Sequence, residues 1–313
     1  MKRQLIAIVG LGKIAVDQHV PAILGNPAFE LAAIVSQRRA TVADLPSFDS
    51  LEALFAAMPE VEVVAFCTPP AGRFEATRTA LRAGRQVLIE KPPAATLGEI
   101  TELAAIAERA GRVLFATWHS RFNPAVAEAR RRLAGQRISR LRVDWREDVR
   151  RWHPGQAWIW QPGGFGVFDP GINALSIVTE IMPEPLFVAA AQLDVPANRQ
   201  TPIGAEISFA TADPAPGTDL SAVFDWRKQG EQSWTIEVAT AAGETLTLTE
   251  GGARLAVNGT PVIEAGSHEY PMIYERFATL LAEGRSEVDI RPLQLVADAF
   301  LVGERRATAP FDD

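Results

Sequence analysis

The sequence predicts an α/β protein: a Rossmann-type doubly wound parallel sheet, followed by a C-terminal α+β domain with an open, mainly antiparallel sheet. Three observations predict this fold class. Up to residue 120, short and almost wholly apolar runs alternate with helix-like segments, as in parallel sheets that are covered on both faces. A glycine-rich turn follows the first run directly. Beyond residue 135, apolar and polar residues alternate, as in antiparallel strands with one buried face.

In the first half, the apolar runs are expected to be strands and the segments between them helices. One helix is expected to begin near Asp49, because Glu52 three residues later would complete a capping box. Another is expected to begin at Thr96, with Glu99 in the same relation. The expected strands are residues 5–9, 31–35, 61–66, 86–89 and 113–116.

The second half is expected to consist mainly of strands, the first at residues 138–145. Further strands are expected at residues 186–195, 203–209, 220–226, 234–238, 245–249 and 253–257, and helices at 170–182, 270–283 and 292–304. We divide the chain into an NAD(P)-binding domain, residues 1–120, and a substrate-binding domain, residues 121–313, which could also form a dimer. An alternative for the last helix, 292–304, is that it packs back on the first domain.

Composition excludes several classes of function. The formal charge of −7 argues against general nucleic-acid binding, which needs a basic face. A single cysteine, Cys67, and four histidines far apart in the sequence predict no disulfide and no metal site. No apolar run reaches the ~20 residues of a membrane span. The apolar run near the N-terminus lacks a signal-peptide cleavage site, so we expect a cytoplasmic protein that does not bind membranes.

The segment from Gly10 to Ala15 fits the G-x-G-x-x-A pattern of dinucleotide-binding turns. Gly10 would permit the tight turn, Gly12 would let the backbone approach a pyrophosphate, and Ala15 would let helix and strand pack closely. Lys13 and Ile14 open the expected helix, whose free N–H groups would face the phosphates. The alternative is an ordinary strand–helix turn without a ligand.

The end of the second expected strand indicates which cofactor is bound. Many NAD-binding proteins place a carboxylate there for the ribose 2′-hydroxyl. This chain instead has Ser36, Gln37, Arg38 and Arg39, so a hydroxyl and two guanidinium groups are available for a 2′-phosphate. We therefore expect NADP to be preferred over NAD. The alternative is that the two arginines simply begin a solvated loop.

Glu90-Lys91-Pro92 follows the expected strand 86–89. With the glycine turn and the two-part layout, it makes the chain resemble the glucose–fructose oxidoreductase and inositol dehydrogenase family over nearly its whole length. Three further segments, residues 118–121, 145–155 and 166–173, resemble those of bacterial NADP-dependent L-arabinose/D-galactose 1-dehydrogenases. The resemblance implies that the protein oxidises the anomeric hydroxyl of a free aldose to a lactone.

The resemblance also implies roles for individual residues. Lys91 matches the lysine that lies near the reacting hydroxyl. Asp169 and Asn173 match a D-x-x-x-H pattern, although many members have histidine where this chain has Asn173, which cannot titrate. The implied catalytic residues are thus Lys91, Asp169 and Asn173. The implied sugar-binding residues are His119, Glu147, Trp152 and His153, and the cofactor side would add Thr68, Pro69, Glu90 and Lys91.

The residues themselves support part of this assignment. Only four of the 31 basic residues are lysines, so a lysine at a strand end suggests a chemical need, because lysine can shift its pKa whereas arginine stays charged. The alternative is a surface lysine paired with Glu90. Asp169 before Pro170 also fits an ordinary helix N-cap. Glycines between residues 163 and 166 favour a ligand nearby, because they would let the backbone approach it.

Five of the seven tryptophans lie between residues 118 and 160, which would suit the apolar faces of a sugar. Core packing is the alternative, and we expect at least two of Trp145, Trp158 and Trp160 to be core residues. His19 and His268 are expected to be structural or surface residues. Other candidate functions are a non-catalytic NADP- or sugar-sensing regulator and a dehydrogenase for another polyol such as inositol. We expect a homodimer, since the open sheet must cover one face.

Overall fold

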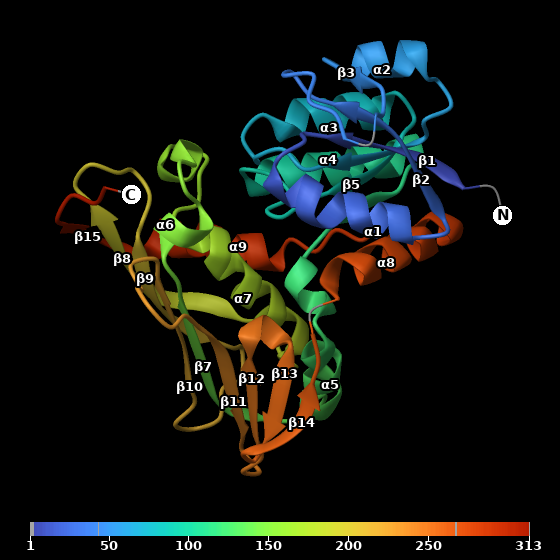
Figure 1. Ribbon diagram of the computed structural model, residues 1–313. Helices are drawn as coiled ribbons and strands as arrows, with labels where there is room; N and C mark the ends of the chain where they lie inside the picture. The colour runs from blue at the N-terminus through green and yellow to red at the C-terminus, as the bar shows by residue number, and fades with distance from the viewer. Residues whose placement is uncertain (1–2, 43, 267, 313) are drawn as a thin grey trace. The chain divides into compact units, whose positions relative to one another are not determined.

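The chain divides into two units, each with its own sheet (Figure 1). The computed structural model describes residues 3–42, 44–266 and 268–312; the ends of the two expected domains at residues 1–2 and 313, and the single positions 43 and 267, lie outside the described residues. Unit 1 comprises Met1–His119 and Glu269–Ile290, and unit 2 comprises Ser120–His268 and Arg291–Asp313.

Unit 1 contains a six-stranded parallel sheet with the strand order β3-β2-β1-β4-β5-β6. This order and direction are those of a Rossmann sheet, as predicted. Its strands are almost wholly buried because helices cover both faces. The strands are β1 Gln4–Val9, β2 Phe29–Val35, β3 Ser47–Phe48, β4 Val63–Phe66, β5 Gln86–Ile89 and β6 Leu114–Ala116, and the helices are α1 Val20–Gly25, α2 Leu51–Ala57, α3 Arg73–Arg82, α4 Leu97–Ala110 and α8 Glu269–Glu283.

Helix α4 has the predicted capping box, whereas α2 begins near the expected position with a different cap. Thr96 accepts a hydrogen bond from the Glu99 backbone while the Glu99 carboxylate accepts one from the Thr96 backbone, so the capping box is confirmed. The expected start of α2 near Asp49 is confirmed to within one residue, although Asp49 itself is not the cap. Ser50 is the N-cap and accepts from the Ala53 N–H at 3.2 Å, because the Asp49 carboxylate pairs with Arg39 instead.

Unit 2 contains a nine-stranded open sheet with the order β14-β13-β12-β11-β7-β10-β9-β8-β15. Neighbouring strands are antiparallel except for β7–β10 and β8–β15, so the mainly antiparallel sheet is confirmed. The strands are β7 Ile138–Arg146, β8 Phe187–Pro196, β9 Gly204–Ala210, β10 Asp219–Asp225, β11 Ser233–Thr240, β12 Thr245–Thr249, β13 Arg254–Val257, β14 Thr260–Glu264 and β15 Glu304–Thr308.

Helix α7 (Phe168–Ile181) lies at the centre of unit 2 and is buried over most of its length. It packs against β7 and β11 and between the helices α5 (Pro124–Leu133) and α9 (Arg291–Val302), as Figure 1 shows. The short helix α6 (Val149–Trp152) follows β7 directly. Helices therefore cover one face of this sheet in the described part of the chain.

The grouping of two C-terminal helices differs from the expected domain boundary. Helix α8 groups with unit 1, where it packs on α1, although the expected division at residue 120 placed it in the second domain. Helix α9, which we considered a candidate to pack back on the first domain, groups with unit 2 and packs on α7 and β8. No described helix is both long and apolar enough to cross a membrane.

Candidate active site

The glycine turn after β1 has the backbone geometry that a dinucleotide needs. Gly10 has a φ of +89°, and a Cβ there would lie 2.7 Å from Cγ2 of Thr68, so only glycine fits this turn. A Cβ on Gly12 would meet no heavy atom of the described residues within 4 Å, so its backbone borders open space. Ala15 is fully buried, which brings the following helix close to the sheet. These residues fit a bound pyrophosphate.

The helical segment that follows this turn opens with Lys13 and Ile14, both exposed, as an anion-facing helix start requires. The Lys13 ammonium pairs with Asp17 four residues later. Residues Ala15–His19 then form a π-helical turn that continues into α1. Such turns are uncommon and occur often at functional sites.

The end of β2 separates the two arginines that we considered for a 2′-phosphate. A turn closed by the Arg39 N–H and the Ser36 carbonyl, at 2.8 Å, reverses the chain here. The Arg39 guanidinium lies 3.1 Å from Asp49 and lowers the pKa of that carboxyl through this hydrogen bond. Gln37 and Arg38 are exposed, and within the described residues the Arg38 side chain forms no hydrogen bond or ion pair. Arg38 is therefore available to a ligand, whereas Arg39 is engaged.

Glu90 and Lys91 follow β5, and the Glu90 carboxylate is buried. It accepts hydrogen bonds from the Lys91 backbone N–H at 2.8 Å and from the Tyr270 hydroxyl at 2.9 Å. Burial by itself would raise the pKa of Glu90, but the hydrogen bond and charge of His19, with His119 and Lys91 nearby, lower it to about 2. The Glu90 carboxylate is thus held inside the protein, and Lys91 itself is half-buried.

Arg73 of α3 holds the same strand ends from the other side. Its buried guanidinium donates to the backbone carbonyls of Thr68, Glu90 and Pro92, the last at 2.6 Å. It therefore joins the segment after β4 to the segment after β5, on both sides of Lys91. The predicted cofactor residues Thr68 (half-buried) and Pro69 (exposed) lie at this edge of the sheet.

His119 lies at the start of the 3₁₀ turn His119–Phe122, where it stacks on Tyr270 with ring centroids 5.7 Å apart. Its Nδ1 lies 3.1 Å from the Glu269 carboxylate. Burial opposes a charge on this ring, but Glu269 and Glu90 raise the pKa of His119 above its ordinary value. The structure thus places His119 beside two carboxylates of unit 1.

In unit 2, Glu147 is a buried carboxylate held by two indole groups. Trp226 donates to its Oε1 at 3.1 Å and Trp234 to its Oε2 at 3.0 Å. The register of the sheet explains this arrangement: Asp225 pairs with Arg146 across β10 and β7, so Trp226 and Glu147 come next on both strands. Neither tryptophan was among the predicted site residues, because this pairing is a long-range contact.

His153 lies between two buried carboxylates. Its Nε2 is 3.8 Å from Glu147 and its Nδ1 is 3.7 Å from Asp169, while its ring packs on Trp226 with centroids 5.1 Å apart. The structure therefore brings together three of the predicted residues, Glu147, His153 and Asp169. Such a group of buried polar side chains can bind the hydroxyls of a sugar.

Asp169 is not the helix cap that its sequence context suggested. Helix α7 begins at Phe168 with Val167 in the N-cap position, so Asp169 lies inside the first turn. Its backbone N–H already donates to the Gly166 carbonyl at 2.8 Å. Asn173, one turn later, is half-buried, and its side chain forms no hydrogen bond within the described residues. Asp169 therefore does not cap the helix, and Asn173 lies one turn further along α7.

The glycines near residue 164 serve packing and do not support a ligand there. A Cβ on Gly164 would lie 2.3 Å from the Trp158 carbonyl oxygen, and one on Gly166 would lie 2.3 Å from that of Pro202. The chain itself therefore fills the space that we expected a ligand to occupy. The expectation that these glycines let the backbone approach a ligand is therefore wrong for Gly164 and Gly166.

The tryptophans divide between core and surface. Trp118, Trp145 and Trp160 are buried. The expectation that at least two of Trp145, Trp158 and Trp160 are core residues is therefore confirmed. Trp152 is 41% exposed and meets Trp234 edge to face at 5.6 Å. His19 is structural and fully buried, and His268 is exposed.

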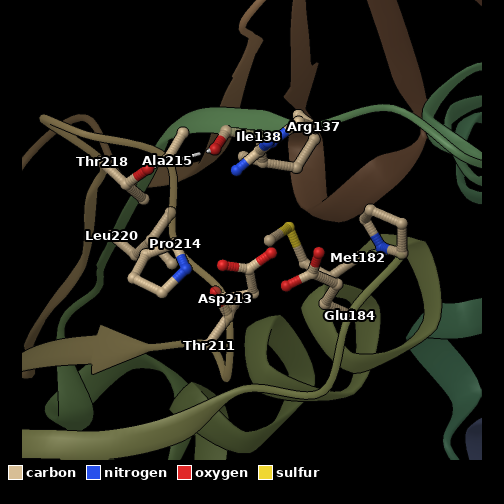
Figure 2. Close-up of a pocket in the computed structure, with 11 residues that line it drawn as sticks. Arg137, Ile138, Met182, Glu184, Thr211, Asp213, Pro214, Ala215, Thr218 and Leu220 are labelled. Atoms are coloured by element: carbon tan, nitrogen blue, oxygen red, sulfur yellow. Dashed lines mark hydrogen bonds between the residues drawn. The ribbon is translucent and has the colours of Figure 1, made fainter.

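Figure 2 shows a hollow on the surface of unit 2, around Arg137, Met182, Glu184 and Asp213, which contains none of the predicted site residues.

Comparison with known proteins identifies the family of the chain. Residues 5–117 match the model of the GFO/IDH/MocA oxidoreductase family, which has an NAD-binding Rossmann fold. Over 312 residues the chain is 46% identical to a galactose 1-dehydrogenase of Pseudomonas fluorescens, covering 98% of each chain.

Solved structures give a similar result. A D-galactose-1-dehydrogenase protein from Rhizobium etli has a TM-score of 0.94 and 49% identity, covering 100% of this chain and 99% of that one. A 3-ketoreductase variant from Actinomadura kijaniata, crystallised with TDP-benzene and NADP, has a TM-score of 0.85 at 17% identity, covering 98% of this chain and 100% of that one. The second match shows a shared fold.

Proposed function

Because the chain belongs to the GFO/IDH/MocA oxidoreductase family, as its motifs indicated, we propose that it is an aldose 1-dehydrogenase acting on D-galactose, L-arabinose or both. The anomeric carbon of the free sugar would lose a hydride and its hydroxyl would lose a proton, which leaves the aldonolactone. The observation that carries this proposal is the 46% identity to a galactose 1-dehydrogenase over nearly the full length of both chains.

The residues of this chain would supply everything except the hydride acceptor, which a bound nicotinamide cofactor provides. The hydroxyl proton needs a base, and the candidates are Lys91 after β5 and Asp169 in the first turn of α7. Glu147 and His153 would bind other hydroxyls, and Trp226 and Trp234 would hold Glu147 in place. Asn173 would hold a neighbouring hydroxyl, since its amide has no partner within the described residues.

A direct assay tests this function. Purified protein is incubated with NADP or NAD and with D-galactose, L-arabinose or an inositol, and the absorbance of the reduced nicotinamide is followed. We expect turnover with an aldose and a lactone as product. Turnover with inositol alone would show a polyol dehydrogenase, and binding of NADP without any turnover across the sugars would show a sensor. Either result would overturn the proposal.

We also propose that NADP is preferred over NAD, with Arg38 binding the 2′-phosphate. Support comes from its exposure at the end of β2 and from the absence of a carboxylate among Ser36, Gln37 and Arg38. Replacing Arg38 by alanine should lower kcat/KM for NADP by roughly 10–100-fold, because a hydrogen bond to a charged group is lost. The value for NAD should change little.

Arg39→Ala is the matched control for this prediction. Its guanidinium already pairs with Asp49, so the loss of NADP selectivity should be much smaller than in Arg38→Ala. Steady-state kinetics with both cofactors measures the ratio. A wild-type protein that prefers NAD, or equal losses in the two variants, would contradict the assignment of Arg38.

A further inference from the structure

Hydrogen bonds of His19 connect the helical segment after the glycine turn to the segment that carries Lys91. His19 is the last residue of the π-helical turn Ala15–His19, and its side chain is fully buried. Its Nε2 lies 3.0 Å from Oε1 of Glu90, and its Nδ1 lies 2.8 Å from the Tyr274 hydroxyl. Both ring nitrogens therefore have partners, one on the Glu90 segment and one on α8.

The Glu90 carboxylate, which contacts His19, also accepts a hydrogen bond from the backbone of Lys91. One of its oxygens faces His19 and the Tyr270 hydroxyl, and the other accepts from the Lys91 backbone N–H at 2.8 Å. The carboxylate thus joins the π-helical turn, α8 and the backbone of Lys91 itself. Because water does not reach the buried carboxylate, it cannot replace a lost donor. The loss of one hydrogen bond would therefore move the carboxylate relative to its remaining donors.

The charges in this network strengthen the connection. Burial opposes a charge on His19, but Cys67, Tyr274 and Glu90 raise its pKa well above the ordinary value, while the pKa of Glu90 is lowered to about 2. The hydrogen bond at 3.0 Å thus joins a ring whose pKa is raised to a carboxylate whose pKa is lowered. Tyr270 and Tyr274 stay protonated at neutral pH, because burial raises the pKa of both hydroxyls.

We propose that His19 is a positioning residue, which fixes Lys91 relative to the cofactor turn through the Glu90 carboxylate. This inference rests on the proposed function in so far as Lys91 acts on the sugar hydroxyl. A base that is misplaced by about 1 Å can cost on the order of 100-fold in rate. The network therefore serves catalysis through Lys91 rather than through contact with substrate.

Three variants test this role. His19→Ala removes the contact to Glu90 and should lower kcat by roughly 10–100-fold, with the KM for NADP nearly unchanged. His19→Gln keeps a side-chain N–H at a similar distance from the backbone and should recover most of that loss. Phe277→Leu is the matched control, because Phe277 is a buried residue of α8 that packs on Phe29 and Phe115 and is not among the hydrogen-bond donors to Glu90. It should lower the melting temperature without lowering kcat.

A second readout does not depend on turnover. An amine-reactive reagent labels the few lysines of the chain, and mass spectrometry follows each site. In His19→Ala the labelling rate of Lys91 should rise several-fold relative to the exposed Lys228, and His19→Gln should behave like the wild type. If the wild type oxidises no aldose, the proposed function fails and this labelling alone decides the positioning role.

Two results would contradict the positioning role of His19. Unchanged labelling of Lys91 in His19→Ala would show that the contact does not position it. A loss of kcat that Phe277→Leu reproduces at a similar melting temperature would show a general effect of stability. If His19→Ala does not fold, Glu90→Gln provides the same test. The new amide N–H group would face one of the three donors that surround Glu90, and that hydrogen bond would be lost. Glu90→Gln should show the same fall in kcat and rise in labelling.

Discussion

Two buried glutamates, Glu90 and Glu147, are among the residues of this molecule that are costly to bury. Burying a carboxylate is unfavourable by several kcal/mol unless hydrogen bonds replace its water. Glu90 receives N–H and O–H donors from Lys91, Tyr270 and His19, and Glu147 receives the indole N–H groups of Trp226 and Trp234. An apolar side chain would be simpler to bury at either position. Such groups are therefore candidates for function, Glu90 beside the proposed base and Glu147 beside the proposed sugar site.

Replacing Lys91 by alanine separates chemistry from cofactor binding. If Lys91 takes or polarises the hydroxyl proton, Lys91→Ala should lower kcat by roughly 10²–10⁴-fold, which is the range of general acid–base catalysis. The dissociation constant of NADP, measured by fluorescence titration, should change far less. Equal losses in kcat and in NADP affinity would mean that Lys91 only holds the cofactor. Asp169→Asn provides the comparison, and a larger loss there would make Asp169 the principal base.

At the scale of the element, local signals predicted most of the fold. The apolar runs became β1, β2, β4, β5 and β6, and the Thr96 capping box begins α4. Strand β15 was missed because its sequence, Glu304–Thr308, is charged and pairs only at the edge with β8. The observed cap of α2 is Ser50, one residue after Asp49, and Asp169 is not a cap because α7 begins two residues earlier than a cap there would require. Competition between adjacent residues cannot be read from spacing alone.

The candidate site was predictable only in part, for the same reason. The resemblance named Glu147, His153 and Asp169, and the structure brings these together around one imidazole. The groups that hold them come from distant elements: Trp234 lies on β11, 87 residues after Glu147. Likewise His19 and Glu90 are 71 residues apart and Tyr270 is 180 residues from Glu90. Register and packing create these contacts, and a single sequence contains no local sign of them.

At the scale of the whole molecule, the open sheet of unit 2 leaves one face without helices among the described residues. Arg142, Ser221, Ser208 and Ala190 form a row across β7, β10, β9 and β8, one residue from each strand. Ser208 and Ala190 are small and exposed, whereas the neighbouring Leu141, Ala222 and Ile207 are buried on the other face. The three small side chains of this row, Ser221, Ser208 and Ala190, would let a second flat surface approach β10, β9 and β8 closely. We therefore propose that a second copy of the chain covers this face.

This proposal predicts the mass of the particle in solution. Light scattering should give about twice the 33.9 kDa of one chain. In a twofold interface every substitution occurs twice, so Ser208→Arg would place two bulky cations in the contact and should shift the mass toward that of one chain. Thr101→Arg, an exposed position of α4, is the matched control and should leave the mass unchanged. A wild-type protein with the mass of one chain at all concentrations would contradict the dimer. A dimer that survives Ser208→Arg would show that the copies meet through another surface.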